Sequence, residues 1–246
     1  MTTTASTSTT GTRLAELWVW AEYYCPWCYV TAVRLSRALP EFAGRLKLAI
    51  RPFPLEVYGG GPPPRAELEL EWPLAALQEP AAAFAPFTFS SQDWPTTTLP
   101  AFEAVWCAQR QEPELALEYD LRIRRAFFAE SRDIGRPEVL LELAREVGFA
   151  MRPFIRDFES GQAREAVLAE GRLGREHYGV RGTPTLMLPD GTRLRPLLAY
   201  PNIRDGRIVA VQPLPCCGDG CQEATRSLIA RAVAWQAPIP GDEEKR

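Results

Sequence analysis

The chain has 246 residues and a formal net charge of −3, so it carries no basic excess that would favour nucleic acid or an anionic membrane surface as a partner. A chain of this length buries about 70–75% of its unfolded surface. Its core therefore does not depend on disulfides, and its six cysteines invite a chemical explanation. The single histidine, His177, excludes sites built from several histidines and disfavours a catalytic Cys–His pair; we expect it on the surface or at a helix end.

The first residues bear on the compartment. Residues 1–12 lack the basic and apolar regions of a secretory signal, and we expect them to form a disordered tail. No window of the sequence approaches the length of uninterrupted apolar residues that a membrane span needs, so no membrane partner is expected. We therefore predict a cytoplasmic protein, in which paired cysteines are more often redox-active or metal-binding than structural.

The first elements along the chain form a β–α–β unit. Residues 17–20 are an apolar run typical of a buried strand, residues 29–39 have helical spacing, and residues 46–51 alternate as a second strand. A CxxC motif, with Cys25 and Cys28, lies between the first strand and the helix. Strands connected in this way are expected to be parallel.

The middle of the chain is predicted to be helical. Residues 58–100 are rich in Gly, Pro, Ala and Thr, which indicates a linker or loop. Helical patterns follow at residues 101–111, 114–130, 137–147, 152–160 and 162–177. Hairpins are then expected around Asp190-Gly191 and Asp205-Gly206, and a last helix near Asp219. We interpret the chain as one α/β fold interrupted by a helical insertion.

The CxxC motif carries the most informative chemistry. A cysteine at a strand-to-helix junction lies at a helix N-terminus, where the macrodipole and free N–H groups favour the thiolate and lower the thiol pKa. We assign Cys25 as the nucleophile and Cys28 as the resolving thiol. Pro26 removes one N–H donor and Trp27 supplies an apolar rim. A zinc site would need further ligands of the same kind, and two buried unreactive cysteines are the structural alternative.

The sequence resembles a known family. CPWCY at residues 25–29 after a strand, followed by GVRGTPT at residues 179–185, is similar to the DsbA family of thioredoxin-fold proteins, in particular its FrnE-like branch. The similarity extends over nearly the whole chain after Arg13. It implies a thioredoxin-like domain formed by residues 13–62 and 179–240, with an all-helical insertion domain at residues 63–178.

The resemblance also assigns roles to residues outside the CxxC. It implies that Pro184 is a cis-proline facing the motif and that Thr183 offers backbone hydrogen bonds to a substrate. It suggests that Glu22, three residues before Cys25, relays a proton to or from Cys28 during resolution. A solvated carboxylate at the end of a strand is the alternative interpretation of Glu22.

A C-terminal group of cysteines departs from the common pattern of the fold. Some FrnE-like proteins carry a second pair with three intervening residues, and Cys217 and Cys221 have that spacing. This pair would be a second dithiol that exchanges with the first. A local disulfide that pins the loop and a soft-metal thiolate site, with Cys216 as the third sulfur, remain alternatives. Cys107, on a predicted helix, is interpreted as a buried apolar residue.

These features predict a thiol:disulfide oxidoreductase that acts on protein or small-molecule disulfides and thiols, with a reducing or oxidising thiol partner. No bound cofactor or metal is expected; glutathione is allowed as a co-substrate, and a homodimer is left open. The enzymatic alternative is a glutathione-dependent transferase or isomerase of the kappa or hydroxychromene-carboxylate isomerase type, which typically has serine at the first motif position. The other alternative is a thiol-based metal-binding or redox-sensing protein built around the C-terminal cysteines.

Overall fold

A four-stranded sheet forms the centre of the protein. The computed structural model describes residues 14–88, 90, 94–213, 216 and 219–235, so the tail predicted at residues 1–12 lies outside the described residues. The strands are β1 (Ala15–Ala21), β2 (Leu46–Pro52), β3 (Thr185–Met187) and β4 (Arg193–Leu194), in the order β2-β1-β3-β4. β1 pairs with β2 in parallel, as predicted, and with β3 antiparallel, and β4 pairs antiparallel with β3.

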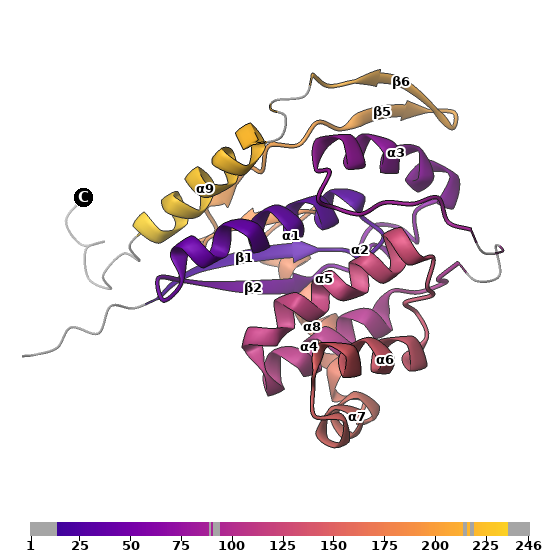
Figure 1. Ribbon diagram of the computed structural model, residues 1–246, viewed down its shortest axis with the longest axis vertical. Coiled ribbons are helices and arrows are strands. Elements are labelled where there is room, and N and C mark those ends of the chain that lie inside the picture. The colour runs from indigo at the N-terminus through magenta and orange to yellow at the C-terminus, as the bar shows by residue number, and fades with distance from the viewer. Residues whose placement is uncertain (1–13, 89, 91–93, 214–215, 217–218, 236–246) are drawn as a thin grey trace, which may run out of the picture.

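Helices cover the two faces of the sheet. α1 (Pro26–Ala38), which is followed by the short 3-10 helix η1 (Leu39–Phe42), contacts α9 (Asp219–Ala234) on one face (Figure 1). α8 (Gln162–Glu176) contacts β2 from the insertion side. The close approach of α8 requires Gly174, because a Cβ there would lie 2.6 Å from the ring of Trp20. α1 begins three residues earlier than the spacing indicated, since Pro26 is a favourable first helical residue.

The helical insertion is confirmed, with one correction. The helices α4 (Leu99–Gln111), α5 (Pro113–Glu130), α6 (Pro137–Val147) and α7 (Met151–Glu159) lie within two residues of their predicted bounds. The stretch predicted as a linker contains α2 (Leu55–Tyr58) and α3 (Arg65–Gln78). The abundant prolines and glycines of this stretch, including Pro73 inside α3, led to the prediction of a linker. The helix forms because Leu68, Trp72 and Ala75 are buried on one of its faces.

The predicted hairpin around Asp205-Gly206 is present as a separate two-stranded sheet. Its strands are β5 (Pro201–Arg204) and β6 (Arg207–Val211). Figure 1 shows this hairpin beside α3, and both strands contact that helix. The segment between β4 and β5 therefore runs from the central sheet to the insertion.

A single apolar cluster joins the sheet, α1 and the insertion. Tyr29 of α1 stacks on Phe128 of α5 with ring centroids 5.3 Å apart, so aromatic side chains from both parts interlock. Cys107 is fully buried in α4, and His177 is exposed at the C-terminal end of α8; both placements were predicted. The division of the chain at residues 62/63 and 178/179 stays a prediction, but the two parts do not have separate cores.

Candidate active site

The two cysteines of the CxxC lie at the start of α1. Cys25 is the N-cap residue of the helix, and its Sγ accepts a hydrogen bond from the backbone N–H of Cys28 at 3.2 Å. Pro26 stands in the first turn, where a missing N–H leaves no helical bond unmade. Both cysteines are free thiols, and Cys25 is the more accessible, with 6% of its surface exposed against 2% for Cys28.

The loop before β3 brings the second motif against the first. The peptide bond between Thr183 and Pro184 is cis, as the resemblance implied. The carbonyl oxygen of Thr183 lies 3.5 Å from Sγ of Cys25 and accepts a hydrogen bond from it. Two segments separated by 158 residues therefore meet at the nucleophile predicted from the sequence. A role for Thr183 in binding substrate stays a prediction.

Burial and hydrogen bonding act in opposite directions on the pKa values of the two thiols. Burial raises the pKa of Cys25 well above its usual range, even though its sulfur accepts the Cys28 N–H. Burial also acts on Cys28, but the hydrogen bond from Cys25 and the positive charge of Arg124 outweigh it and lower the pKa of Cys28. At Cys25 the helix N-terminus, which was predicted to favour the thiolate, therefore acts against desolvation of the same sulfur, and the assignment of Cys25 as the nucleophile stays a prediction.

Glu22 is buried beside the motif and is not the solvated carboxylate of the alternative interpretation. Its carboxylate accepts hydrogen bonds from the backbone N–H groups of Tyr23, at 2.5 Å, and Leu55, at 2.5 Å, and from the hydroxyl of Thr98 at 2.8 Å. Burial nevertheless raises the pKa of Glu22 to about 7. Its backbone N–H faces Sγ of Cys28 at 3.5 Å, so the residue connects to the resolving thiol through the main chain.

Trp27 packs beside the motif against two residues that the sequence did not indicate; with 3% of its surface exposed, it is buried and does not form the apolar rim predicted for it. Its indole N–H donates to the carboxylate of Glu71 on α3 at 2.9 Å, and its ring packs edge-on against Tyr200 at a centroid distance of 5.2 Å. Burial raises the pKa of Glu71 to about 7. Neither residue belongs to a recognisable motif, because α3 lies in the stretch predicted as a linker and Tyr200 lies in the connection to β5.

A buried ion pair from α5 lies behind the motif and was also missed. Arg124 and Asp120 are each about 1% exposed, and the guanidinium makes two hydrogen bonds to the carboxylate, at 2.8 and 3.1 Å. The third contact of Arg124 is the carbonyl oxygen of Glu22 at 2.9 Å. In the sequence these residues have the i, i+4 spacing of an ordinary surface pair, so no local signal marks them as buried.

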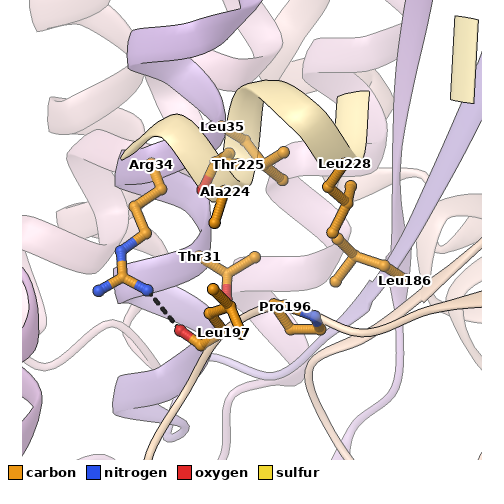
Figure 2. Close-up of a pocket in the computed structure, with 9 residues that line it drawn as sticks. All are labelled: Thr31, Arg34, Leu35, Leu186, Pro196, Leu197, Ala224, Thr225 and Leu228. Atoms are coloured by element: carbon orange, nitrogen blue, oxygen red, sulfur yellow. Dashed lines mark hydrogen bonds between the residues drawn. The ribbon is translucent and has the colours of Figure 1, made fainter. Parts of the chain in front are cut away.

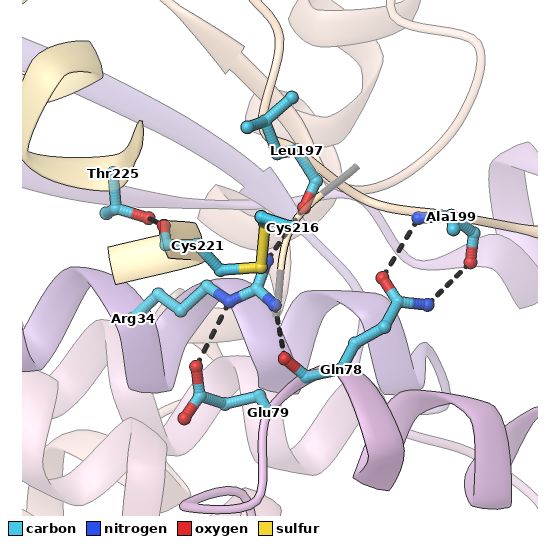
Figure 3. Close-up of a disulfide and its surroundings, with 8 residues drawn as sticks. All are labelled: Arg34, Gln78, Glu79, Leu197, Ala199, Cys216, Cys221 and Thr225. Atoms are coloured by element: carbon cyan, nitrogen blue, oxygen red, sulfur yellow. Dashed lines mark hydrogen bonds and ion pairs between the residues drawn. A yellow bond between two sulfur atoms is a disulfide. The ribbon is translucent and has the colours of Figure 1, made fainter. Parts of the chain in front are cut away.

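The C-terminal cysteines form a different pair from the predicted one. A disulfide joins Cys216 to Cys221, with Cα atoms 5.1 Å apart, at the N-terminal end of α9 (Figure 3). The pairing of Cys217 with Cys221 is therefore wrong, because Cys221 is already bonded, and Cys217 itself lies outside the described residues. The disulfide also withdraws two of the three sulfurs from the thiolate site that was an alternative.

Around this disulfide, polar contacts hold the segment that leads to Tyr200. The guanidinium of Arg34 on α1 donates to the carbonyl of Leu197 at 2.7 Å and is paired with Glu79 at 3.1 Å. The side chain of Gln78 exchanges two hydrogen bonds with the backbone of Ala199, at 2.6 and 2.9 Å (Figure 3). The connection to β5 is thereby fixed to α1 and α3, which positions Tyr200 against Trp27.

A small cavity between α1 and α9 lies apart from the CxxC. It holds about 10 Å³ and is lined by residues that include Thr31, Leu186, Leu197 and Leu228 (Figure 2). That volume is close to the space of one water molecule, so the cavity is too small for a substrate. Neither Cys25 nor its partner in the motif belongs to its lining.

Across the described ranges, no group of three or more His, Cys, Asp or Glu side chains is placed to hold a metal ion. Within the same part of the chain, no helix has the length and apolar character that crossing a bilayer requires.

Comparisons with known proteins complete the description of the site. A family model described as a DSBA-like thioredoxin domain matches residues 16–203, whereas no curated protein sequence matches the chain. A protein from Nitrosomonas europaea, provisionally named a protein disulfide isomerase, has a similar structure, with a TM-score of 0.65 and 22% identity over 92% of this chain and 100% of that one. For the cytosolic disulfide reductase DsbM from Pseudomonas aeruginosa with GSH, the TM-score is 0.59 and the identity 26%, over 73% of this chain and 89% of that one.

A third solved structure is similar at the level of the fold alone. A 2-hydroxychromene-2-carboxylate isomerase has a TM-score of 0.52 and 14% identity, over 71% of this chain and 86% of that one. With the family match, these similarities confirm the α/β, thioredoxin-like fold with a helical insertion that the sequence predicted. None of them distinguishes the FrnE-like branch.

Proposed function

The chain belongs to the family of DSBA-like thioredoxin domains, and from this premise we propose that it is a thiol:disulfide oxidoreductase whose CxxC exchanges with disulfides and thiols. The observation that carries the proposal is the meeting of a free dithiol at a helix N-terminus with the carbonyl of Thr183, next to the cis-proline. A dithiol in that position can take up and return two electrons through the formation and cleavage of one disulfide.

In the proposed reaction, Sγ of Cys25 attacks one sulfur of a substrate disulfide. A mixed disulfide forms, the substrate disulfide breaks, and the first substrate thiolate leaves. Sγ of Cys28 then attacks Cys25, which releases the second substrate thiolate and leaves the Cys25–Cys28 disulfide. The substrate gains the two electrons that the dithiol loses, and a thiol partner restores the dithiol. The reverse sequence oxidises a substrate dithiol.

Accessibility supports Cys25 as the attacking thiol despite the lower pKa of Cys28. Cys25 is the more exposed of the two and faces the Thr183 loop, whereas Cys28 lies behind it in the first turn of α1. The hydrogen bond between the two thiols gives the proton of Cys25 a route to Cys28 as Cys25 attacks. Once Cys25 is in the mixed disulfide, Cys28 carries that proton and must give it up, to Glu22 or to the departing substrate thiolate, before it attacks as the second nucleophile.

We assign Glu22 as a proton acceptor for the dithiol. A carboxyl group with a pKa of about 7 can take and return a proton near neutral pH, and this one is buried one residue beyond β1, next to the peptide group that faces Cys28. The polar contacts to Thr98 and Leu55 fix its orientation. These contacts support the assignment made from the resemblance.

We further propose glutathione as the small-thiol partner and the cytoplasm as the compartment. DsbM, whose solved structure with GSH is similar to this chain, is described as a cytosolic disulfide reductase. The glutathione-dependent isomerase alternative is less well supported, because this chain keeps two free cysteines in the motif and needs no additional group to carry electrons. A thiol-based metal-binding role would need the C-terminal sulfurs, two of which are in a disulfide.

Insulin reduction and oxidative refolding of a reduced model protein test the proposed function. Cys25→Ser should abolish both activities, and Cys28→Ser should accumulate the mixed disulfide, which mass spectrometry detects. Cys107→Ser is the matched control, because it removes the buried free thiol of α4 without touching the motif. Activity in Cys25→Ser equal to that of the unaltered protein would overturn the proposal. Release of zinc on thiol modification would favour the metal-binding alternative.

A further inference from the structure

The helical insertion supplies a buried cation behind the CxxC. Arg124 lies on α5, and its side chain is about 1% exposed, so its charge is not screened by solvent. Two of its nitrogens bind Asp120, and the remaining NH group donates to the carbonyl oxygen of Glu22 at 2.9 Å. The N–H of the same Glu22 faces Sγ of Cys28 at 3.5 Å. One residue of the main chain thus separates the guanidinium from the resolving sulfur.

Packing alone does not account for this arrangement. A buried ion pair often contributes nothing to stability relative to apolar side chains of similar volume, because desolvation offsets the attraction. α5 already buries an aromatic face that includes Phe127 and Phe128, so a further apolar pair would complete its contacts. The charge is also held in a defined direction, since the hydroxyl of Tyr23 donates to Asp120 at 2.9 Å and the Tyr23 ring lies 4.6 Å from the guanidinium.

Among the residues that the structure describes, the other titratable groups next to the dithiol do not supply a cation. From the segment after β1 come Glu22 and Tyr23, from α3 comes Glu71, and from the connection to β5 comes Tyr200, all of which are neutral or negative. The only histidine of the chain is exposed at the end of α8. Within the described part of the chain, Arg124 is therefore the cation behind the motif.

We propose that Arg124 is a positioning residue that stabilises the thiolate of Cys28, both by its charge and by holding the main chain of Glu22 on the side opposite to the N–H that faces the sulfur, and thereby shifts the active-site pair toward the dithiol. The proposal rests on the proposed function. The relevant equilibrium is the reduction of the Cys25–Cys28 disulfide by two molecules of glutathione, which gives the dithiol and one molecule of oxidised glutathione. Of the two states of the protein, only the dithiol has a Cys28 thiol that can ionise, so only that state responds to the cation.

The experiment measures this equilibrium constant and the thiolate titration by ultraviolet absorbance across pH. In Asp120→Asn/Arg124→Met, the buried pair is neutralised together, so no lone charge is left behind. We expect its equilibrium constant for reduction to fall about tenfold at alkaline pH, the change that corresponds to one pKa unit. The difference should vanish at a pH where the thiols of both proteins are protonated, which loss of packing alone would not produce.

Single variants keep the proposal testable if the double variant does not fold. Asp120→Asn leaves Arg124 without its carboxylate partner, so we expect the thiolate to be more stable and the equilibrium constant to rise. Arg124→Lys keeps the charge and should retain most of the effect. Arg125→Met is the matched control, since Arg125 lies next in the helix but is 63% exposed. Titrations of Asp120→Asn and the double variant that coincide with that of the unaltered protein would overturn the proposal.

The same measurements separate this proposal from the proposed function. If the unaltered protein does not exchange with glutathione or with insulin, the proposed function fails. The absorbance titration of the thiols does not depend on exchange and still reports whether Arg124 stabilises the thiolate. If exchange is normal in every protein and the thiolate titration is the same in all of them, the proposed function stands and the role of Arg124 is refuted.

Discussion

Replacement of Glu22 by Gln should remove a pH dependence of stability that the buried carboxyl imposes. In the folded protein the pKa of Glu22 is about 7, whereas the ordinary value is 4.5, because burial disfavours the charged form. The protonated carboxyl is therefore favoured by folding. Its contribution to stability is fully present below pH 4.5 and is lost as the pH rises toward and through 7. Gln cannot ionise, so Glu22→Gln lacks this loss.

The size of the effect follows from the two pKa values. Each pKa unit corresponds to about 1.4 kcal/mol, so ionisation of Glu22 lowers the free energy of unfolding by about 3 kcal/mol over the full window. Gln presents an N–H group where the carboxylate accepted hydrogen bonds from Leu55, Tyr23 and Thr98, which adds a cost in the variant. That cost does not change with pH. The diagnostic quantity is therefore how the difference in free energy of unfolding between the two proteins changes with pH, and not the size of that difference at one pH.

Urea unfolding of both reduced proteins, at several pH values from about 5 to about 8, measures the difference between their free energies of unfolding. The stability of Glu22→Gln relative to the unaltered protein should rise by about 2 to 3 kcal/mol across that range. Glu71 also has a raised pKa, but it is present in both proteins, so its contribution cancels in the difference. Parallel pH profiles of the two proteins would refute the reasoning, because they would mean that Glu22 ionises in the folded protein as it does in water.

Three further substitutions test the framework around the site. Replacement of Cys216 and Cys221 by serine opens a six-residue ring and should lower the free energy of unfolding by about 2 kcal/mol, as in the unaltered protein after reduction. Gly174→Ala places a Cβ 2.6 Å from the Trp20 ring, so thermal unfolding should show a loss of about 1–3 kcal/mol. Arg34→Met leaves buried Glu79 with Arg37 as its remaining cation, and a loss of about 3 kcal/mol in urea unfolding is expected. If the free energy of unfolding of any of the three variants equals that of the unaltered protein, the stabilising role given to the corresponding contact is wrong.

Local patterns in the sequence determine most of the elements. The prolines that open α4, α5 and α6 and the apolar spacing that follows them are sufficient to place these helices. The exception is α3, whose interior Pro73 and proline-rich approach look like a linker, because composition says nothing about a buried face. At the C-terminus, adjacent cysteines leave the partner of Cys221 undetermined, since spacing alone does not distinguish Cys216 from its neighbour.

The site was predictable only where it consists of motifs. The CxxC and the Thr183-Pro184 loop are visible in the sequence because each is a local pattern with a known chemical use. The polar wall behind them depends on which helix of the insertion packs there, and helical periodicity gives the apolar face of a helix but not its neighbour. Asp120 and Arg124 consequently look like a solvent-exposed pair.

The position of the insertion relative to the motif explains how a chain with one exposed histidine builds an environment for a thiolate. Four polar contacts join the insertion to the segment between β1 and Cys25. Thr98 donates to the Glu22 carboxylate and Arg124 to the Glu22 carbonyl, while the hydroxyls of Tyr23 and Tyr24 donate to Asp120 and to the carbonyl of Pro95. A shift of α4 or α5 against the sheet would change these contacts together, and with them the charge that faces Cys28. Substrate contacts on the insertion would therefore act on the redox equilibrium of the dithiol through the same segment, without touching either sulfur.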